Sequence, residues 1–249
     1  MLIEFVLLVG AGFLAGILNT IAGGGTFLTL PALIFSGVPP VAANATSTVA
    51  VFPGYVGAVA GYRSELASIS RPKLLKLSLL CAVGGCLGSC LLLVSSDEAF
   101  SMIVPVLLAA STLVFAYGER LQNWSRRHKG ASSNNAVGSV LVSVYGGYFN
   151  GGLGIVLLAL FSTWGMRDFN EMNALKNGVS LLVALSSVFV FSVSGLIAWP
   201  SAITMMIATI AGGYAGAPLS KTLPQKVLRK LVVLIGASMS LLFLLKALA

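Results

Sequence analysis

Charged residues are scarce in this sequence. Asp, Glu, Lys and Arg together make up 9% of the 249 residues, whereas apolar residues make up 57%. A soluble domain carries about a quarter of its residues as charged side chains. A water-soluble fold of this length cannot bury so much apolar surface, and the mean hydropathy is +0.97. The composition therefore predicts an integral membrane protein that crosses the bilayer several times.

The residue types used by most enzymes and metal sites are also nearly absent. The one histidine, His128, lies in a basic stretch, and apart from Glu4 near the start of the first apolar segment no Asp or Glu falls inside one. Cys81, Cys86 and Cys90 share one apolar stretch without further ligands nearby, so we interpret them as small packing residues. We therefore expect no catalytic residue, no metal site and no cofactor. The lack of carboxylates at membrane depth also argues against a cation pump.

The formal net charge of +8 does not indicate nucleic acid as a partner, because the basic residues lie in short loops between apolar segments. That placement is typical of membrane orientation. The first apolar segment, residues 2–22, has no basic start and is followed at once by more apolar sequence. We therefore expect it to be an uncleaved first membrane helix rather than a signal peptide.

Ten apolar segments are present, five before and five after a polar stretch. They cover residues 2–22, 26–35, 41–62, 74–94, 100–117, 136–149, 155–164, 178–192, 201–217 and 228–247. An upright span needs about 20 residues. The segments 26–35 and 155–164 are too short, and we expect half-helices or the returning arms of re-entrant hairpins.

The second five segments repeat the order of glycine, asparagine and proline positions found in the first five. A shift of 129 residues relates Gly25 to Gly154 and the pair Asn44-Ala45 to Asn173-Ala174. A shift of 128 residues relates Pro72 to Pro200. Matches that follow in the same order across a whole half indicate internal duplication.

Loop charges predict that the two repeats are inverted. Basic residues mark the loops near Lys73, Arg126 and Lys226 as cytoplasmic, whereas residues 95–98 and 192–200 lack basic residues and are predicted to be external. Equivalent loops thus fall on opposite sides. We expect a first repeat at 1–118, a basic cytoplasmic loop at 119–135 and a second, inverted repeat at 136–249, with both termini external. Inverted repeats with broken helices are typical of transporters.

Two glycine clusters would break helices at membrane depth. Gly23, Gly24 and Gly25 follow Asn19, and the equivalent cluster follows Asn150. Each break frees backbone N–H groups at the start of the next helix, where the dipole favours an anion. The alternative interpretation of each cluster is close helix packing by small residues.

Polar residues open the next segment in each repeat. Asn44, Thr46 and Ser47 begin the segment 41–62, and a matching polar group lies around Lys176, which stands at the position equivalent to Ser47. A charge at this depth usually faces a cavity. The alternative is a basic residue at a cytoplasmic helix end, paired with Asp168 or Glu171.

These stretches resemble the TauE/SafE sulfite-exporter-like family, also called the TSUP family. The similarity is carried by GGGTFLTLP at 23–31, ANATSTV at 43–49, GAVAGYRSEL at 57–66, and residues 150–157 and 173–177. The resemblance implies a multi-pass inner-membrane transporter of small sulfur-containing or organic anions, such as sulfite or sulfonates. The sequence departs from the pattern at Leu153, which interrupts the second glycine cluster, and at Leu175-Lys176, so the two half-sites are not equivalent.

Together these patterns predict an all-α polytopic membrane protein of two inverted repeats, with eight full spans and two short or re-entrant half-helices. We expect a transporter, most simply an exporter, that is surrounded by membrane lipid. It would bind a small anion near the midplane and move it by alternating access. A homodimer, an anion channel and a non-transporting membrane scaffold remain open alternatives. The predicted binding residues are Asn19, Gly23, Gly24, Gly25, Thr26, Asn44, Thr46, Ser47, Asn150, Gly151, Gly152, Gly154, Asn173, Lys176 and Asn177.

Overall fold

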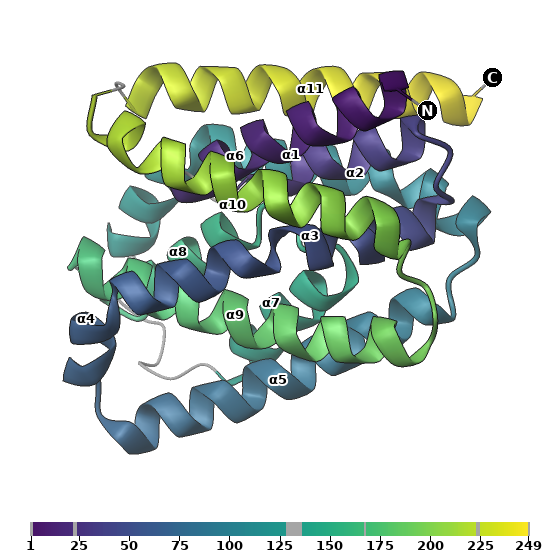
Figure 1. Ribbon diagram of the computed structural model, residues 1–249. Helices are drawn as coiled ribbons and strands as arrows, with labels where there is room; N and C mark the ends of the chain where they lie inside the picture. Colours follow the sequence, from purple (N-terminus) through teal and green to yellow (C-terminus); the bar gives the residue numbers. More distant parts are fainter. Residues whose placement is uncertain (1, 22–23, 128–135, 167, 223–224, 249) are drawn as a thin grey trace.

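The computed structural model describes residues 2–21, 24–127, 136–166, 168–222 and 225–248. Within these ranges the chain forms eleven helices and no strand, which confirms the all-α prediction (Figure 1). The helices are α1 (Leu2–Ile21), α2 (Thr26–Phe35), α3 (Pro40–Gly61), α4 (Arg63–Ser68), α5 (Arg71–Leu93), α6 (Asp97–Arg127), α7 (Ala136–Tyr148), α8 (Leu153–Thr163), α9 (Phe169–Val193), α10 (Trp199–Thr222) and α11 (Gln225–Leu248).

Three of the described helices are long and apolar enough to cross a membrane by length and composition. The qualifying windows are Leu2–Asn19 in α1, Leu74–Leu93 in α5 and Asn170–Val193 in α9. Twenty helical residues span about 30 Å, the thickness of the hydrocarbon core. The count of eight spans stays a prediction.

The predicted boundaries agree to within one residue at α1, α2, α3 and α7. Helix α2 covers the predicted residues 26–35, and α8 begins two residues before the predicted 155. The predicted start of the following segment at residue 178 is wrong, because α9 begins at Phe169. The Asp168 carboxylate accepts hydrogen bonds from the backbone N–H groups of Asn170 and Glu171 at 2.7 and 3.0 Å. This N-cap makes the polar residues that follow helical.

The polar stretch in the middle of the chain is helical over its first part, since α6 continues to Arg127. Residues 128–135, which include His128, lie outside the described residues. The short helix α4 was not predicted, because its six residues carry no apolar periodicity. The division into two repeats and a loop stays a prediction.

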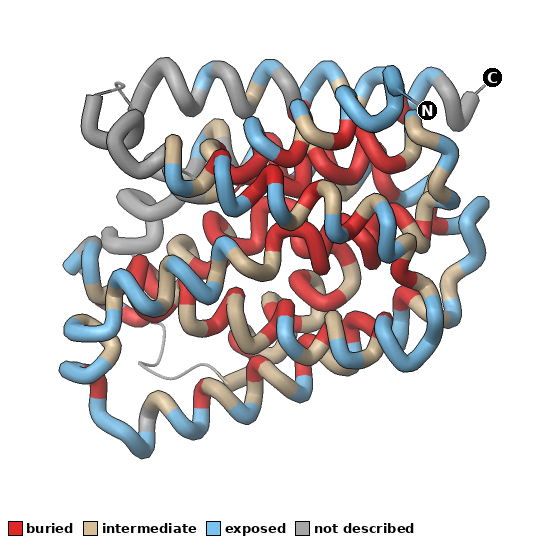
Figure 2. The backbone as a smooth tube through the Cα atoms, in the orientation of Figure 1, coloured by how far each residue is buried: buried red, intermediate tan, exposed pale blue. Residues whose placement is uncertain are grey.

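The two short helices lie in the interior of the molecule. Figure 2 shows the buried segments gathered in the middle of the bundle, and most residues of α2 and of α8 are buried. One apolar cluster includes Phe27, Leu30 and Leu33 of α2. A second includes Leu157 and Phe161 of α8. Backbone that breaks at membrane depth is tolerated only where protein covers it, and this packing supplies the cover.

The long helices pair closely around this interior. Helix α1 packs on α10, α5 packs on α7, and α3 packs on both α9 and α10. Glycines permit the close approach. A Cβ at Gly16 of α1 would lie 2.2 Å from the carbonyl oxygen of Thr209 in α10, and one at Gly88 of α5 would lie 2.1 Å from that of Val144 in α7.

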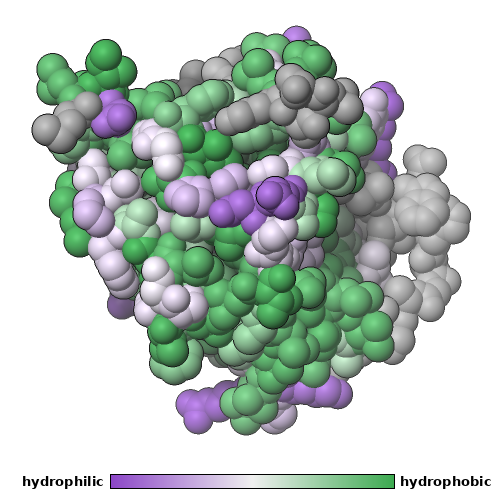
Figure 3. All heavy atoms as spheres, turned by 90° about the vertical axis from the view of Figure 1, so that its right-hand side faces the viewer, coloured by the Kyte–Doolittle hydropathy of each residue, from purple (hydrophilic) through white to green (hydrophobic). Residues whose placement is uncertain are grey.

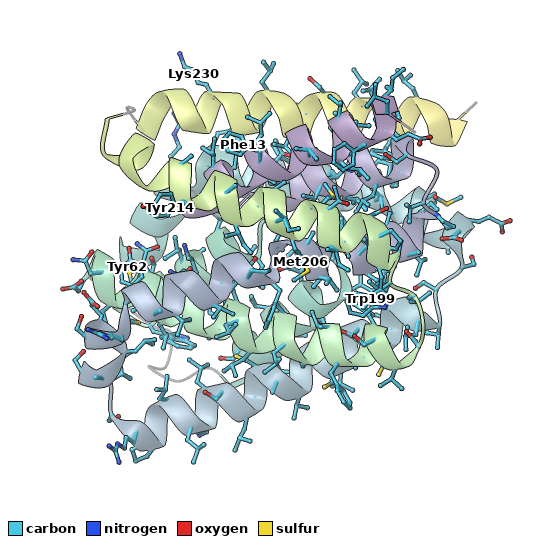
Figure 4. All side chains as sticks on the ribbon, viewed as in Figure 1. Phe13, Tyr62, Trp199, Met206, Tyr214 and Lys230 are labelled. Atoms are coloured by element: carbon cyan, nitrogen blue, oxygen red, sulfur yellow. The ribbon has the colours of Figure 1, made fainter. Side chains whose placement is uncertain are left out.

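The connections between helices are gathered at two ends of the bundle. The start of α1, the end of α11 and the α5–α6 and α9–α10 connections lie at one end, and α4 lies at the other (Figure 1). Tyr62 and Trp199 lie near opposite ends (Figure 4), as aromatic residues do at the two interfaces of a membrane. The end that carries both termini shows hydrophilic residues among apolar ones (Figure 3).

Gly16→Ala is expected to destabilise the protein, because the added methyl would meet backbone atoms of α10 that cannot move aside. Overpacking of this kind costs about 1–3 kcal/mol. Gly10→Ala is the matched control in the same helix, since nothing lies within 4 Å of a Cβ there. Thermal unfolding in detergent should show a lower Tm for the first variant and an unchanged or higher Tm for the second. Equal Tm values would contradict the close α1–α10 contact.

Single cysteines at Ser68 and Ser96 should be labelled from opposite sides of the membrane. Both residues are exposed, one in α4 and the other before α6, so they lie at opposite ends of the bundle (Figure 1). In a background without Cys81, Cys86 and Cys90, an impermeant thiol reagent should reach S96C from outside and S68C only after the membrane is opened. Labelling of both from the same side would contradict the predicted topology.

Candidate functional site

The turn between α7 and α8 has an unusual backbone conformation. Asn150 has a φ of 55° and Gly152 a φ of 72°. Only Gly, and to a lesser extent Asn and Asp, adopts this left-handed region at low cost. The sequence Asn-Gly-Gly therefore lets the chain reverse within a few residues. Gly152 is the N-cap of α8, and no side chain caps it.

Two tyrosines hold this turn from neighbouring helices. The Tyr145 hydroxyl of α7 donates to the carbonyl oxygen of Gly151, and it lies 2.9 Å from the Ser111 hydroxyl of α6. The Tyr55 hydroxyl of α3 donates to Asn150 Oδ1 at a long 3.5 Å. The turn is thus fixed by hydrogen bonds to side chains, as buried irregular backbone requires.

The turn between α1 and α2 is held differently. Asn19 Oδ1 accepts a hydrogen bond from the backbone N–H of Gly25 at 2.8 Å. Gly24, Gly25 and Thr26 are buried; the predicted site residue Gly23 lies outside the described residues. The Asn19 amide therefore occupies one of the N–H groups that a ligand would otherwise use.

The polar residues of α3 have separate partners. Asn44 Nδ2 donates to the carbonyl oxygen of Tyr148, at the end of α7, at 2.7 Å. Ser47 shares a hydrogen bond with Thr29 of α2, the two hydroxyl oxygens being 2.6 Å apart. Thr46 accepts from the backbone N–H of Ala198 at 3.0 Å. Thr46 therefore anchors the α9–α10 connection.

On α9, Asn173, Lys176 and Asn177 lie within the helix, and both asparagines are buried. The stem of Lys176 lies against the first turn of α8. Its Cδ and Cε are 3.2 and 3.8 Å from the position that a Cβ would take at Gly154. A glycine at this position leaves room for the lysine stem.

Two positive groups therefore meet at the start of α8. One is the N-terminus of the helix, with its positive dipole end. The N–H groups of Leu153, Ile155 and Val156 bond carbonyl oxygens of the turn, which leaves the N–H group of Gly154 for a ligand. The other is the Lys176 ammonium, one bond beyond a carbon that lies close to Gly154. In the part of the chain that the structure describes, no ion pair joins Lys176 to Asp168 or Glu171. Positive groups brought together in this way attract an anion.

The contacts sort the predicted residues into two groups. One group surrounds the α7–α8 turn and consists of Asn44, Asn150, Gly151, Gly152, Gly154 and Lys176. The other surrounds the start of α2 and consists of Asn19, Gly24, Gly25, Thr26 and Ser47. On α9, Asn173 lies about one turn before Lys176 and Asn177 directly follows it.

Four contributing residues were missed by the sequence analysis: Ser111, Tyr145, Tyr55 and Thr29. Each lies inside an apolar segment, where a single hydroxyl looks unremarkable. A signal was present for Tyr55, which lies eleven residues after Asn44 and so on the same face of α3. Ser111 and its neighbour Thr112 were a polar pair in the middle of an apolar segment.

The family model described as "Sulfite exporter TauE/SafE" matches residues 8–243. The chain belongs to this family. The match confirms the resemblance found in the sequence, and it covers both glycine breaks and Lys176.

Curated relatives of this TauE/SafE chain carry names of membrane transporters. The chain is 29% identical over 233 residues to the "Probable membrane transporter protein YfcA" of Escherichia coli strain K12, covering 91% of this chain and 84% of that protein. It is 28% identical to a "Probable membrane transporter protein" of Haemophilus influenzae, covering 92% and 90% of the two chains. It is 24% identical to the "Probable membrane transporter protein ORF9" of a Sinorhizobium species, covering 93% and 88%. No solved structure matches the chain. The family is one of membrane transporters, in agreement with the apolar helices of this chain.

Gly152→Val should abolish transport by this TauE/SafE protein. A branched residue is strongly disfavoured at a φ of 72°, and its Cβ would lie 2.9 Å from the Ser111 Cβ. Gly195→Val is the control, since Gly195 has a φ of 71° with nothing within 4 Å. Both variants carry backbone strain of about 1–2 kcal/mol, but only the first should lose uptake in proteoliposomes at equal reconstitution. Normal transport by Gly152→Val would mean that the break between α7 and α8 serves only helix packing.

Proposed function

We propose that this protein transports a small oxyanion across the membrane and binds it at the start of α8. The observation that carries this proposal is the convergence of Lys176 with an uncapped helix N-terminus at Gly154. Removing a charge from water is costly unless it is paired. An anion between the ammonium and the Gly154 N–H group would stabilise both, and a charge-assisted hydrogen bond contributes about 1.5–3 kcal/mol.

The helix pairing supports two inverted repeats. Exchanging α1 with α7 and α10 with α5 turns the α1–α10 pair into the α7–α5 pair. The same exchange of halves turns the α3–α10 contact into the α9–α5 contact, and both contacts occur. Eight spans with α2 and α8 as re-entrant half-helices fit this pattern. Alternating access would then move one repeat against the other around the anion.

The substrate class follows from the family description and from the site. The family is described as sulfite exporters, and the site offers donors and one cation to a small anion. We propose sulfite, sulfonates or related organic anions, exported across an inner membrane with both chain ends external. No aromatic or extended apolar pocket is needed for such a ligand.

A scaffold that only packs against a partner is the alternative from another class. A scaffold has no reason to leave polar groups unpaired in its interior. In this protein Asn44 Oδ1 and Asn150 Nδ2 are buried without a hydrogen-bond partner among the described residues, and such groups are costly unless a ligand or water completes them. This observation favours a binding site.

Counterflow in proteoliposomes tests the transporter directly. Vesicles loaded with unlabelled sulfite should accumulate labelled sulfite transiently, because a carrier exchanges ligand across the membrane. Thiosulfate, small sulfonates and carboxylates in the lumen identify the preferred anion. An anion channel would give flux without counterflow, and a scaffold would give neither.

Lys176→Met should weaken anion binding at least about tenfold. Methionine keeps the apolar stem against Gly154 but removes the charge, and about 1.4 kcal/mol corresponds to a factor of ten. Lys176→Arg should be intermediate, since the planar guanidinium needs a different geometry. Lys230→Met is the control, because Lys230 of α11 is exposed and its side chain points away from the rest of the bundle (Figure 4). The dissociation constants can be measured by calorimetry in detergent; equal values for Lys176→Met and wild type would remove Lys176 from the site.

A further inference from the structure

Two buried amide atoms lie unpaired in the interface between α3 and the α7–α8 turn. Asn44 is 1% exposed and Asn150 is 3% exposed. Asn44 Oδ1 and Asn150 Nδ2 have no hydrogen-bond partner in the described part of the chain. One is an acceptor and the other is a donor. A ligand that pairs with both must therefore offer a hydrogen-bond donor as well as an acceptor.

The other atom of the Asn44 amide fixes the orientation of that side chain. Asn44 Nδ2 donates to the carbonyl oxygen of Tyr148, so turning this amide over would place two acceptors against each other. In the orientation that the structure gives, Asn150 Oδ1 accepts from the Tyr55 hydroxyl at 3.5 Å. A tyrosine hydroxyl can both donate and accept, so Asn44 carries the argument. The unpaired atoms are then an oxygen on Asn44 and an N–H group on Asn150.

Both unpaired atoms lie at the same interface. Asn44 and Tyr55 are eleven residues apart, just over three helical turns, and so project from one face of α3. Their partners, Tyr148 and Asn150, bracket the end of α7. The turn that starts there leads directly to Gly152 and to the start of α8.

We propose that the bound oxyanion also carries a hydrogen-bond donor, which Asn44 Oδ1 accepts while Asn150 Nδ2 donates to an anionic oxygen. This inference rests on the proposed function. A fully deprotonated oxyanion offers only acceptors, so it would leave Asn44 Oδ1 unpaired or opposed to a ligand oxygen. The donor is either the proton of a singly protonated oxyanion or a hydroxyl group on its carbon chain.

Pairs of anions of similar size test the proposal in wild-type proteoliposomes; the members of the first pair have equal charge at every pH, and those of the second pair once sulfite is singly protonated. The first pair is 2-hydroxyethanesulfonate and propanesulfonate, compared as competitors of counterflow at one pH. The second pair is sulfite, which gains a proton as the pH falls, and methanesulfonate, which does not. In the pair that carries the relevant donor, we expect the two anions to differ about tenfold in the concentration that inhibits counterflow. A tenfold difference corresponds to about 1.4 kcal/mol.

The two pairs distinguish the source of the donor. A preference for the hydroxyalkyl sulfonate at every pH places the donor on the carbon chain. Tighter competition by sulfite at lower pH, with methanesulfonate unchanged, places it on the oxyanion itself. Either result supports the proposal, whereas equal competition within both pairs would overturn it and would mean that the two amides hold buried water.

Asn44→Leu identifies the accepting atom. In this variant both anions of the discriminating pair should inhibit counterflow equally, and the anion without a donor should still bind. Thr48→Val is the control, because the Thr48 hydroxyl already donates to the backbone oxygen of Asn44 at 3.0 Å one turn away. It should keep the discrimination. If Asn44→Leu cannot be isolated, the two anion pairs measured on the wild-type protein still test the proposal. If no anion in either pair competes or exchanges, the proposed function itself is wrong, whereas anion exchange without discrimination overturns only this inference.

Discussion

The structure depends on one constraint: a backbone that leaves the helical hydrogen-bond pattern inside a membrane protein must find every partner within the protein. Two breaks, before α2 and before α8, violate the helical pattern in the interior of this chain. Several buried hydrogen bonds between helices are arranged around them. Tyr145, Tyr55 and Asn19 each supply a hydrogen bond to one of the turns, and the long helices cover both.

Close helix pairing follows from the same constraint. The two short helices span only about half of a bilayer at 1.5 Å per residue, so their ends must be enclosed by neighbours rather than by lipid. Glycines at the α1–α10 and α5–α7 contacts bring backbones close enough for this enclosure. The glycine content of the chain therefore serves two separate purposes, tight pairing at Gly16 and Gly88 and chain reversal at Gly152.

The sequence was sufficient for the class of fold and for the places where helices break, because hydrophobicity and glycine clusters are local signals. It was insufficient for the role of each polar residue. Thr46 and Ser47 are adjacent and similar, but one bonds the connection before α10 and the other bonds α2. Such partners lie far away in the sequence. The start of α9 was missed because apolar periodicity hides a polar first turn that the Asp168 cap makes helical.

The partners found for each residue also make the two halves unequal. Around α2, the Gly25 N–H is bonded to Asn19 and the Ser47 hydroxyl to Thr29, so these groups are satisfied within the protein. Around α8, Asn150 Nδ2 lacks a partner among the described residues, and Lys176 replaces the equivalent of Ser47. Unsatisfied donors and an unpaired cation are what an anion needs, whereas satisfied groups only hold structure. The sequence already makes the half-sites unequal at Leu153 and Lys176. The hydrogen bonds add that the groups left for the proposed anion lie at the second break and, across the interface, on Asn44 of the first half.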